Sequence, residues 1–163
     1  MDSVTVSVNI SRPRLEVFEY LADIANHPEF TDHYLVDWHM TRQETYGRGA
    51  GARFKLKQRR NRFPWADVTF AEVEAPHRIV EVGRRGKFNR IRTVGIYELT
   101  EAPGGTTRVT FTLQTQPKLI SDHILEVGAR GWHRRHGSRS MRRLRAILET
   151  GRRRGQRATI AGG

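Results

Sequence analysis

The chain begins with a strict alternation of apolar and polar side chains over residues 4–10. Successive side chains of a strand point to opposite faces, so this pattern predicts a strand with one buried face. Over residues 15–24 the apolar side chains recur at helical spacing instead, which predicts a short amphipathic helix. We expect this helix to end at His27-Pro28, because the residue before a proline is displaced from the helical region.

The middle of the chain predicts a series of strands. They cover residues 34–42, 52–58, 65–74, 79–82, 92–100 and 107–115. Short segments rich in glycine and proline separate them, and Pro103-Gly104-Gly105 is a strong hairpin signal. Parallel neighbours would need long crossover connections, so strands joined by short turns predict an antiparallel meander.

After Pro117 the apolar period becomes helical again and predicts one long helix that ends at Gly151. A meander with one apolar face has to cover that face, and this helix is the only predicted element long enough to do so. The sequence therefore predicts an α+β helix-grip fold, in which a curved antiparallel sheet of about six to seven strands wraps around a long C-terminal helix, with a short helix after the first strand. We expect a single domain over residues 1–150 and a basic, mobile tail over 151–163.

The 163-residue chain has a formal net charge of +12, and residues 118–163 alone carry 12 basic and 3 acidic side chains. This excess leaves open an association with nucleic acid or an anionic membrane surface through the basic C-terminal third, and the side chains that would carry it are Arg142, Arg143, Arg145, Arg152, Arg153 and Arg154. Arginine outnumbers lysine 25 to 4, which is typical of a GC-rich bacterial genome. A solvated basic face without function is therefore the alternative.

The chain has no cysteine, no signal-peptide pattern and no apolar run approaching the roughly 20 residues that span a bilayer. These features predict a soluble, cytoplasmic protein without disulfides. His133 and His136 are three residues apart, but a zinc site needs three or four ligands, so we predict no metal site. We also expect no other cofactor, and the sequence leaves open whether the protein is a monomer or a homodimer.

Several stretches together carry a family resemblance. They are VTVSVNI and SRPRLEVF over residues 4–18, ADIANHPEF over 22–30, GAGARF over 49–54, EAPHRI over 74–79, YEL and GTTRV within 97–109, and LRAILE over 144–149. In these motifs the chain resembles the SRPBCC superfamily, which includes START-type lipid-binding domains and bacterial polyketide cyclase/dehydrase-like proteins. The resemblance implies a cavity between the sheet and the C-terminal helix. Because the superfamily contains lipid carriers, hormone receptors and cyclases, it implies a fold and no single function.

Strand alternation and helical spacing then predict which side chains line that cavity. Taking Leu144 and Leu148 as inward places His133 and Arg130 on the same helix face. The alternative is a helix broken at its glycines, which would leave both in solvent, and for the aromatic residues the alternative is a solid core. The predicted ligand-binding residues are Trp38, Phe54, Leu56, Trp65, Tyr97, Phe111, Arg130 and His133.

The expected function is the binding of a small hydrophobic ligand, such as a lipid, an isoprenoid or a polyketide-like molecule, in this internal cavity. The alternative is a polyketide aromatase/cyclase or dehydratase acting in the same cavity. That activity requires polar groups that converge deep in the pocket to polarise carbonyls, and Tyr97, Arg130 and His133 are candidates. The sequence does not assign catalytic residues.

Overall fold

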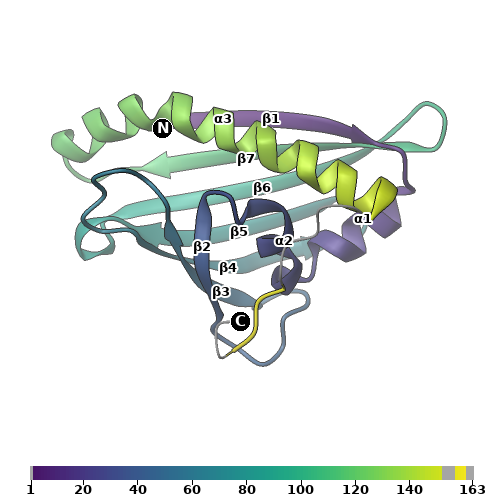
Figure 1. The fold of residues 1–163 in the computed structure, drawn as a ribbon, viewed down its shortest axis with the longest axis horizontal. Coiled ribbons are helices and arrows are strands. Elements are labelled where there is room, and N and C mark those ends of the chain that lie inside the picture. The colour runs from purple at the N-terminus through teal and green to yellow at the C-terminus, as the bar shows by residue number, and fades with distance from the viewer. Residues whose placement is uncertain (1, 152–156, 161–163) are drawn as a thin grey trace.

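The computed structural model describes residues 2–151 and 157–160. Its sheet has seven antiparallel strands in the spatial order β1-β7-β6-β5-β4-β3-β2, so β2 to β7 form the predicted meander and β1 joins its far edge through β7 (Figure 1). The sheet is curled, and one face is concave (Figure 1). The strands are β1 Asp2–Ile10, β2 Leu35–Met40, β3 Gly51–Leu56, β4 Trp65–Glu74, β5 Arg78–Arg85, β6 Ile91–Ala102 and β7 Thr106–Gln116.

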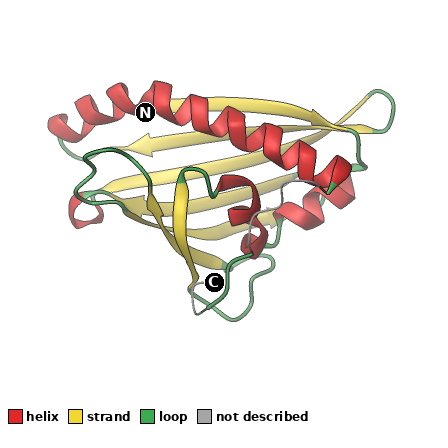
Figure 2. Ribbon diagram, in the orientation of Figure 1, coloured by secondary structure: helices red, strands yellow, loops and turns green. Residues whose placement is uncertain are grey.

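The helices lie between β1 and β2 and after β7, with one short turn of helix between β5 and β6 (Figure 2). The long helix α3, Ile120–Thr150, runs across the concave face and ends at Gly151, which has a φ of 67° as a left-handed cap requires. The helix-grip fold is therefore confirmed. The other helices are α1 Arg14–Leu21, η1 Ile24–Asn26, α2 His27–Thr31 and η2 Lys87–Asn89.

The predicted first helix is in fact three short helices. The chain leaves α1 after Leu21, and the Asp23 carboxylate accepts a hydrogen bond of 3.1 Å from the Ala25 amide, which caps η1. Pro28 does not end a helix as predicted. It lies in the first turn of α2, where a missing N–H costs nothing.

Helix α3 is continuous from Ile120 to Thr150, so the alternative of a helix broken at its glycines is wrong. Its inward face passes close to β1, because a Cβ atom on Gly137 would lie only 3.4 Å from Val6. The buried residues of α3 are Asp122, Glu126, Ala129, Gly137, Ser140, Met141, Leu144 and Ile147. The face is therefore polar in its N-terminal half and apolar in its C-terminal half, as the sequence predicts.

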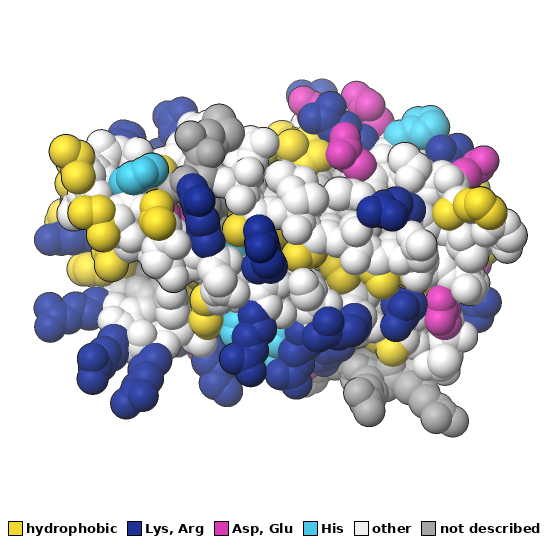
Figure 3. Space-filling view, turned by 90° about the horizontal axis from the view of Figure 1, so that it is seen from above, with side chains coloured by type: hydrophobic (Ala, Val, Ile, Leu, Met, Phe, Trp, Pro, Cys, Tyr) yellow, Lys and Arg dark blue, Asp and Glu magenta, His cyan; other side chains and the backbone are white. Residues whose placement is uncertain are grey.

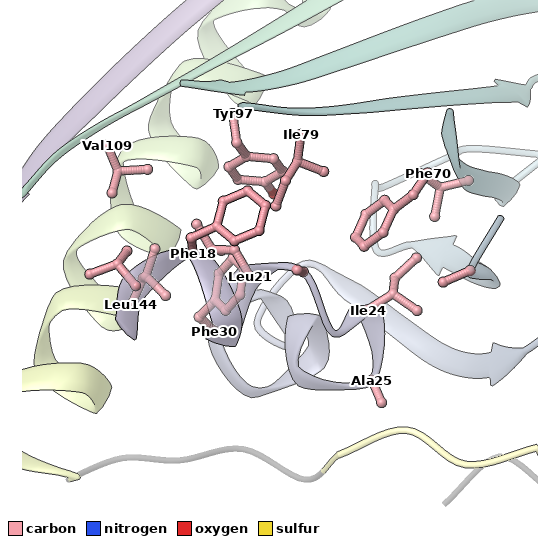
Figure 4. Close-up of a cluster of buried hydrophobic side chains, with 14 of the residues drawn as sticks. Phe18, Leu21, Ile24, Ala25, Phe30, Phe70, Ile79, Tyr97, Val109 and Leu144 are labelled. Carbon is pink, nitrogen blue, oxygen red and sulfur yellow. The ribbon is translucent and has the colours of Figure 1, made fainter. Parts of the chain in front are cut away.

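The main core lies under the C-terminal half of α3 (Figure 4). Phe18 and Leu21 of α1 and Phe30 of α2 fill the space between Leu144 and the sheet, where they meet Val109 (Figure 4). Burial of each such side chain contributes about 1.5–3 kcal/mol to stability. The space around Leu144 is therefore filled by side chains.

Residues 157–160 contact the domain. The Ala158 amide donates to the Ala25 carbonyl at 3.1 Å, Met40 donates to Thr159 at 3.2 Å, and Arg157 forms an ion pair with a carboxylate near η1. Backbone hydrogen bonds therefore join this segment to the domain, and the mobility of the tail stays a prediction. The rest of the predicted tail, including Arg152, Arg153 and Arg154, lies outside the described residues. No described helix combines the length and apolar character needed to cross a membrane.

Candidate functional site

The interior under the middle of α3 contains a hollow with two lobes. The inner lobe has a volume of about 50 Å³ and the outer lobe about 80 Å³. Both are bounded by the same six side chains, which are Tyr34, Leu35, Phe54, Val68, Glu81 and Phe111. Pockets for drug-sized ligands measure about 300–1,000 Å³, so in this conformation the interior is closer to the packed alternative than to an open cavity.

Strand alternation correctly places most of the predicted site residues around this hollow. Trp38 packs against Phe54 with ring centroids 4.5 Å apart, and Tyr97 packs against Phe111 at the same separation. All four line the inner lobe, while Leu56 and His133 line the outer lobe. Their role in ligand binding remains a prediction.

Trp65 points away from the hollow, against the prediction. It comes directly before the inward Ala66, so the alternation of β4 turns it to the convex face. There the cationic groups of Arg53 and Lys55 lie 4.8 and 4.7 Å from its ring centroid. Its position is uncertain in the sequence because it is the first residue of the strand.

Arg130 is exposed and lines neither lobe, so its predicted inward position is wrong. A step of three residues back from His133 rotates the helix by about 300°, whereas a step of four comes closer to the same face. Ala129 therefore occupies the inward position, and it is buried.

Glu81 is the functional candidate that sequence reasoning missed. It lies on the inward phase of β5 and borders both lobes, and no hydrogen bond joins its carboxyl to another described residue. Burial raises its pKa from 4.5 to about 7. The signal is present in the alternation, because Ile79 is inward and Glu81 is two residues further along the same strand.

Two tyrosines, Tyr34 and Tyr97, lie close enough to Glu81 for its charge to raise their pKa values. Burial raises the pKa of Tyr34 to about 12, with a smaller upward effect of Glu81 and an opposing effect of the Ser140 hydroxyl. Burial, and then Glu81 and Tyr34, raise the pKa of Tyr97 well above its ordinary value. Both phenols therefore keep their protons at neutral pH. With a protonated Glu81, the hollow offers three neutral O–H groups, which can donate hydrogen bonds to a carbonyl oxygen.

A buried ion pair closes the outer lobe. Arg85 at the end of β5 donates to Glu126 of α3 at 2.5 Å and lies 3.2 Å from Nε2 of His133. The side chains of the pair are only 10% and 5% exposed. Burial and the Arg85 charge lower the pKa of His133 to about 3, so its ring is neutral and Nε2 can accept a hydrogen bond.

Outside the ion pair lies an open groove of about 550 Å³. It is lined by residues 58–63 of the β3–β4 loop, by the first turns of α3, and by residues where β5 turns into β6, which are Arg85, Gly86, Lys87, Arg90 and Ile91. Leu56 and Arg85 border both this groove and the outer lobe. The groove is therefore the mouth of the hollow, and the Arg85–Glu126 pair separates the two.

The arrangement gives no support to a metal site. His136 stacks on Tyr34 with centroids 5.1 Å apart, whereas His133 faces Arg85. Among the residues that the structure describes, no group of three or more histidine, aspartate or glutamate side chains is placed to share a metal ion.

A curled antiparallel sheet around a long C-terminal helix, with a hollow between them, defines a helix-grip protein of the SRPBCC type. The sequence profile of the family described as polyketide cyclase / dehydrase and lipid transport matches residues 1–149, and the chain belongs to this family. No curated protein sequence is significantly similar to the chain.

Solved structures with the same fold come from bacteria and plants. A protein from Thermus thermophilus is 14% identical to this chain with a TM-score of 0.67, and the match covers 90% of this chain and 97% of the Thermus protein. Truncated norcoclaurine synthase from Thalictrum flavum has a TM-score of 0.68 at 8% identity, covering 90% and 92%. Ginseng major latex-like protein 151 from Panax ginseng has a TM-score of 0.63 at 11% identity, covering 90% and 97%. At these identities the similarity establishes the fold alone.

Proposed function

We propose that the protein binds a small, largely apolar molecule that carries a hydrogen-bond acceptor such as a carbonyl oxygen. The observation that carries this proposal is Glu81, a partly buried carboxyl that borders both lobes of a hollow with aromatic walls and has no hydrogen-bond partner among the described residues. A hydrogen bond between a ligand oxygen and a protonated Glu81 would contribute about 0.5–1.5 kcal/mol to binding. The family description, which names polyketide cyclases and lipid transport, supports a lipid, isoprenoid or polyketide-like ligand.

Such a ligand needs more room than the two lobes provide, so binding requires an expansion of the hollow. The N-terminal half of α3 is the element that can move. Its ties to the β5–β6 hairpin are the ion pairs Arg85–Glu126 and Arg90–Asp122, whereas its C-terminal half packs on the core through Leu144. Outward movement of the N-terminal half would join the lobes to the groove.

A cavity-filling variant tests the binding function. Val68 borders both lobes, so Val68→Phe fills the space that the ligand would occupy. Val82→Phe adds the same ring on an exposed position of β5 and serves as the control. The measurements are mass spectrometry of small molecules that co-purify with each variant, and the fluorescence of added 1-anilinonaphthalene-8-sulfonate. We expect both signals in the wild type and in Val82→Phe and a loss of both in Val68→Phe. Equal signals in the two variants would place binding outside the hollow and refute the proposal.

A second candidate function is proton-transfer catalysis in the same hollow, as in a polyketide cyclase or dehydratase. The observation that favours it is the convergence of Glu81, Tyr34 and Tyr97, with a Glu81 pKa of about 7. A carboxyl that titrates near neutral pH can take a proton from the carbon beside a carbonyl, while a phenol donates a hydrogen bond to the resulting enolate oxygen. The name of the norcoclaurine synthase indicates that an enzyme can be built on this fold.

Exchange of α-protons of 2-nonanone in heavy water tests this candidate without knowledge of the substrate. The Glu81 carboxylate would remove an α-proton, and the enolate would then take back a deuteron. We expect exchange catalysed by the wild type to rise as the pH passes through about 7, where Glu81 ionises. Glu81→Gln should abolish it, whereas Glu72→Gln, at an exposed position of β4, should not. Exchange that both variants retain would exclude Glu81 as the base.

A further inference from the structure

Exposed apolar side chains lie at the end of the molecule that contains the mouth of the hollow, and two of them, Phe63 and Leu125, line the groove. Ile120 and Phe88 are 82% and 80% exposed, which is unusual for side chains of their size. Figure 3 shows apolar side chains gathered at the end of the molecule where α3 begins, with lysine and arginine side chains beside them. We call this set the apolar rim, and it consists of Phe63, Phe88, Ile120, Ile124 and Leu125.

The apolar rim comes from three separate elements, which are the β3–β4 loop, the β5–β6 turn and α3. Phe88 has a φ of 54°, in the left-handed region that bulky residues avoid, and its side chain is almost fully exposed. Exposed apolar residues scattered singly need no explanation, whereas a group gathered at one end of a molecule marks an interaction site.

Two residues of the apolar rim, Ile120 and Ile124, belong to a stripe of α3 that no described part of the domain covers. Ile120 and Ile124 are four residues apart, and Val127 follows on the same side of the helix. Glu126 and Ala129 lie on the opposite, buried side. A helix that only covered the sheet would carry polar residues on its outer side, so this N-terminal segment is apolar where the fold does not require it.

The charge around the apolar rim is almost entirely positive. The acidic residues nearby, Asp122 and Glu126, are buried and already paired with Arg90 and Arg85. Among the ion pairs within residues 2–151 and 157–160, none involves the exposed cations beside the rim. These cations are Arg59, Arg60, Arg62, Lys87 and Lys118.

We propose that the apolar rim docks the mouth of the protein on an anionic lipid bilayer. Exposed apolar side chains would enter the boundary between headgroups and acyl chains, and the cations beside them would contact anionic headgroups. A second copy of the chain fits less well, because pairing two such rims would bring two groups of like charges together. Docking would place the groove directly over the membrane. Membrane docking is a property separate from the proposed ligand binding, because it does not require a ligand in the hollow.

Sedimentation with vesicles tests the docking surface on the full chain. One set of vesicles contains equal parts of phosphatidylglycerol and phosphatidylcholine, and the other contains phosphatidylcholine alone. We expect partitioning onto the anionic vesicles, weakened by salt, and little onto the neutral ones. The triple variant Phe88→Ser, Ile120→Ser and Ile124→Ser should lose about tenfold in partition coefficient for each residue. The control Leu15→Ser, at an exposed position of α1, should bind like the wild type.

A charge variant separates the rim from the basic C-terminal third. Arg59→Gln, Arg62→Gln and Lys87→Gln together should lose about fivefold for each cation. The matched control is Arg139→Gln, Arg142→Gln and Arg145→Gln, at exposed positions of α3. If the control loses binding and the rim variant does not, the C-terminal third is the docking surface and the proposal is wrong.

Two other results would also overturn the proposal. One is the absence of wild-type binding to anionic vesicles at low salt. The other is a dimer in analytical ultracentrifugation that the serine variant abolishes, with no vesicle binding, which would make a second copy the occupant. Circular dichroism of each variant checks that the fold is retained, and because ligand extraction is measured separately, failure of docking leaves the binding function intact.

Discussion

The carboxyl group of Glu81 occupies the space that a side chain at position 95 would fill. Glu81 and Gly95 are paired across β5 and β6, and a Cβ atom on Gly95 would lie 2.4 Å from Oε1 of Glu81. Non-bonded atoms do not approach so closely, so the inward position of Glu81 depends on the missing side chain of its neighbour.

Gly95→Ala should therefore lower the free energy of unfolding by about 1–3 kcal/mol, because it overpacks the site. Gly137→Ala is a matched control, since its Cβ atom would lie 3.4 Å from Val6, and it should stay within about 1 kcal/mol of the wild type. Chemical denaturation measures both. Adding Glu81→Ala to Gly95→Ala should recover part of the loss, and strictly additive effects would contradict the contact.

Glu81 should also make stability depend on pH. Its pKa is about 7 in the folded protein and 4.5 as an ordinary glutamate, so between these values the folded state binds more protons than the unfolded state. The stability that a neutral Glu81 permits is fully present below pH 4.5 and is lost as the pH rises through 7, by about 3 kcal/mol in total. Glu81→Gln cannot ionise, so its unfolding free energy relative to the wild type should increase by about that amount over this range. A constant difference would show that Glu81 titrates normally.

His27 should produce the opposite dependence. Its ring is buried between Phe30 and Phe70, and Nε2 donates to the Leu21 carbonyl at 2.8 Å. Burial lowers its pKa from 6.5 to about 4, so its contribution is present above pH 6.5 and is lost as the pH falls toward 4. His27→Gln should cost about 1–3 kcal/mol at neutral pH, and this cost should shrink on acidification. Urea titrations at several pH values measure it, and a pH-independent cost would show that the ring charges freely in the fold.

The effects of substituting Arg85 and Glu126 on the free energy of unfolding should depend strongly on each other. Removing one partner leaves a buried charge uncompensated, so Glu126→Leu and Arg85→Met should each cost about 3–5 kcal/mol. The double variant should be more stable than either single variant, because it leaves no unpaired charge. It should also take up 1-anilinonaphthalene-8-sulfonate faster in stopped-flow fluorescence, since the pair closes the mouth. Unchanged uptake would show that ligands enter elsewhere.

The strands and the residues around the hollow were largely predictable, because a period of two has only two phases. Once Phe54 and Tyr97 lie on the apolar phase of their strands, their inward direction follows. The direction of a side chain on a long helix is harder to predict. Arg130 and Leu144 are fourteen positions apart, and an error of one position rotates a side chain by about 100° around the helix. That is why Ala129, and not Arg130, proved to be inward.

Glu81 shows a different limit of sequence reasoning. The alternation of β5 places it inward, but the desolvation cost of a buried carboxylate argues against that position. Two features make the inward position of Glu81 possible. Its raised pKa keeps the carboxyl neutral, and Gly95 on the neighbouring strand leaves room for it. The second requires the pairing register of β5 and β6, which the sequence of a single chain does not specify.

Polar contacts attach the first half of α3 to the domain, so access to the interior can change separately from the packing of the core. Two arginine–carboxylate pairs, Arg85–Glu126 and Arg90–Asp122, join this half to the β5–β6 hairpin, while the packed core lies beneath the other half. Access to the interior can therefore change without disturbing the main hydrophobic contacts of the fold. Substitutions that replace both partners of a pair together would tune how often the entrance opens while leaving no buried charge unpaired.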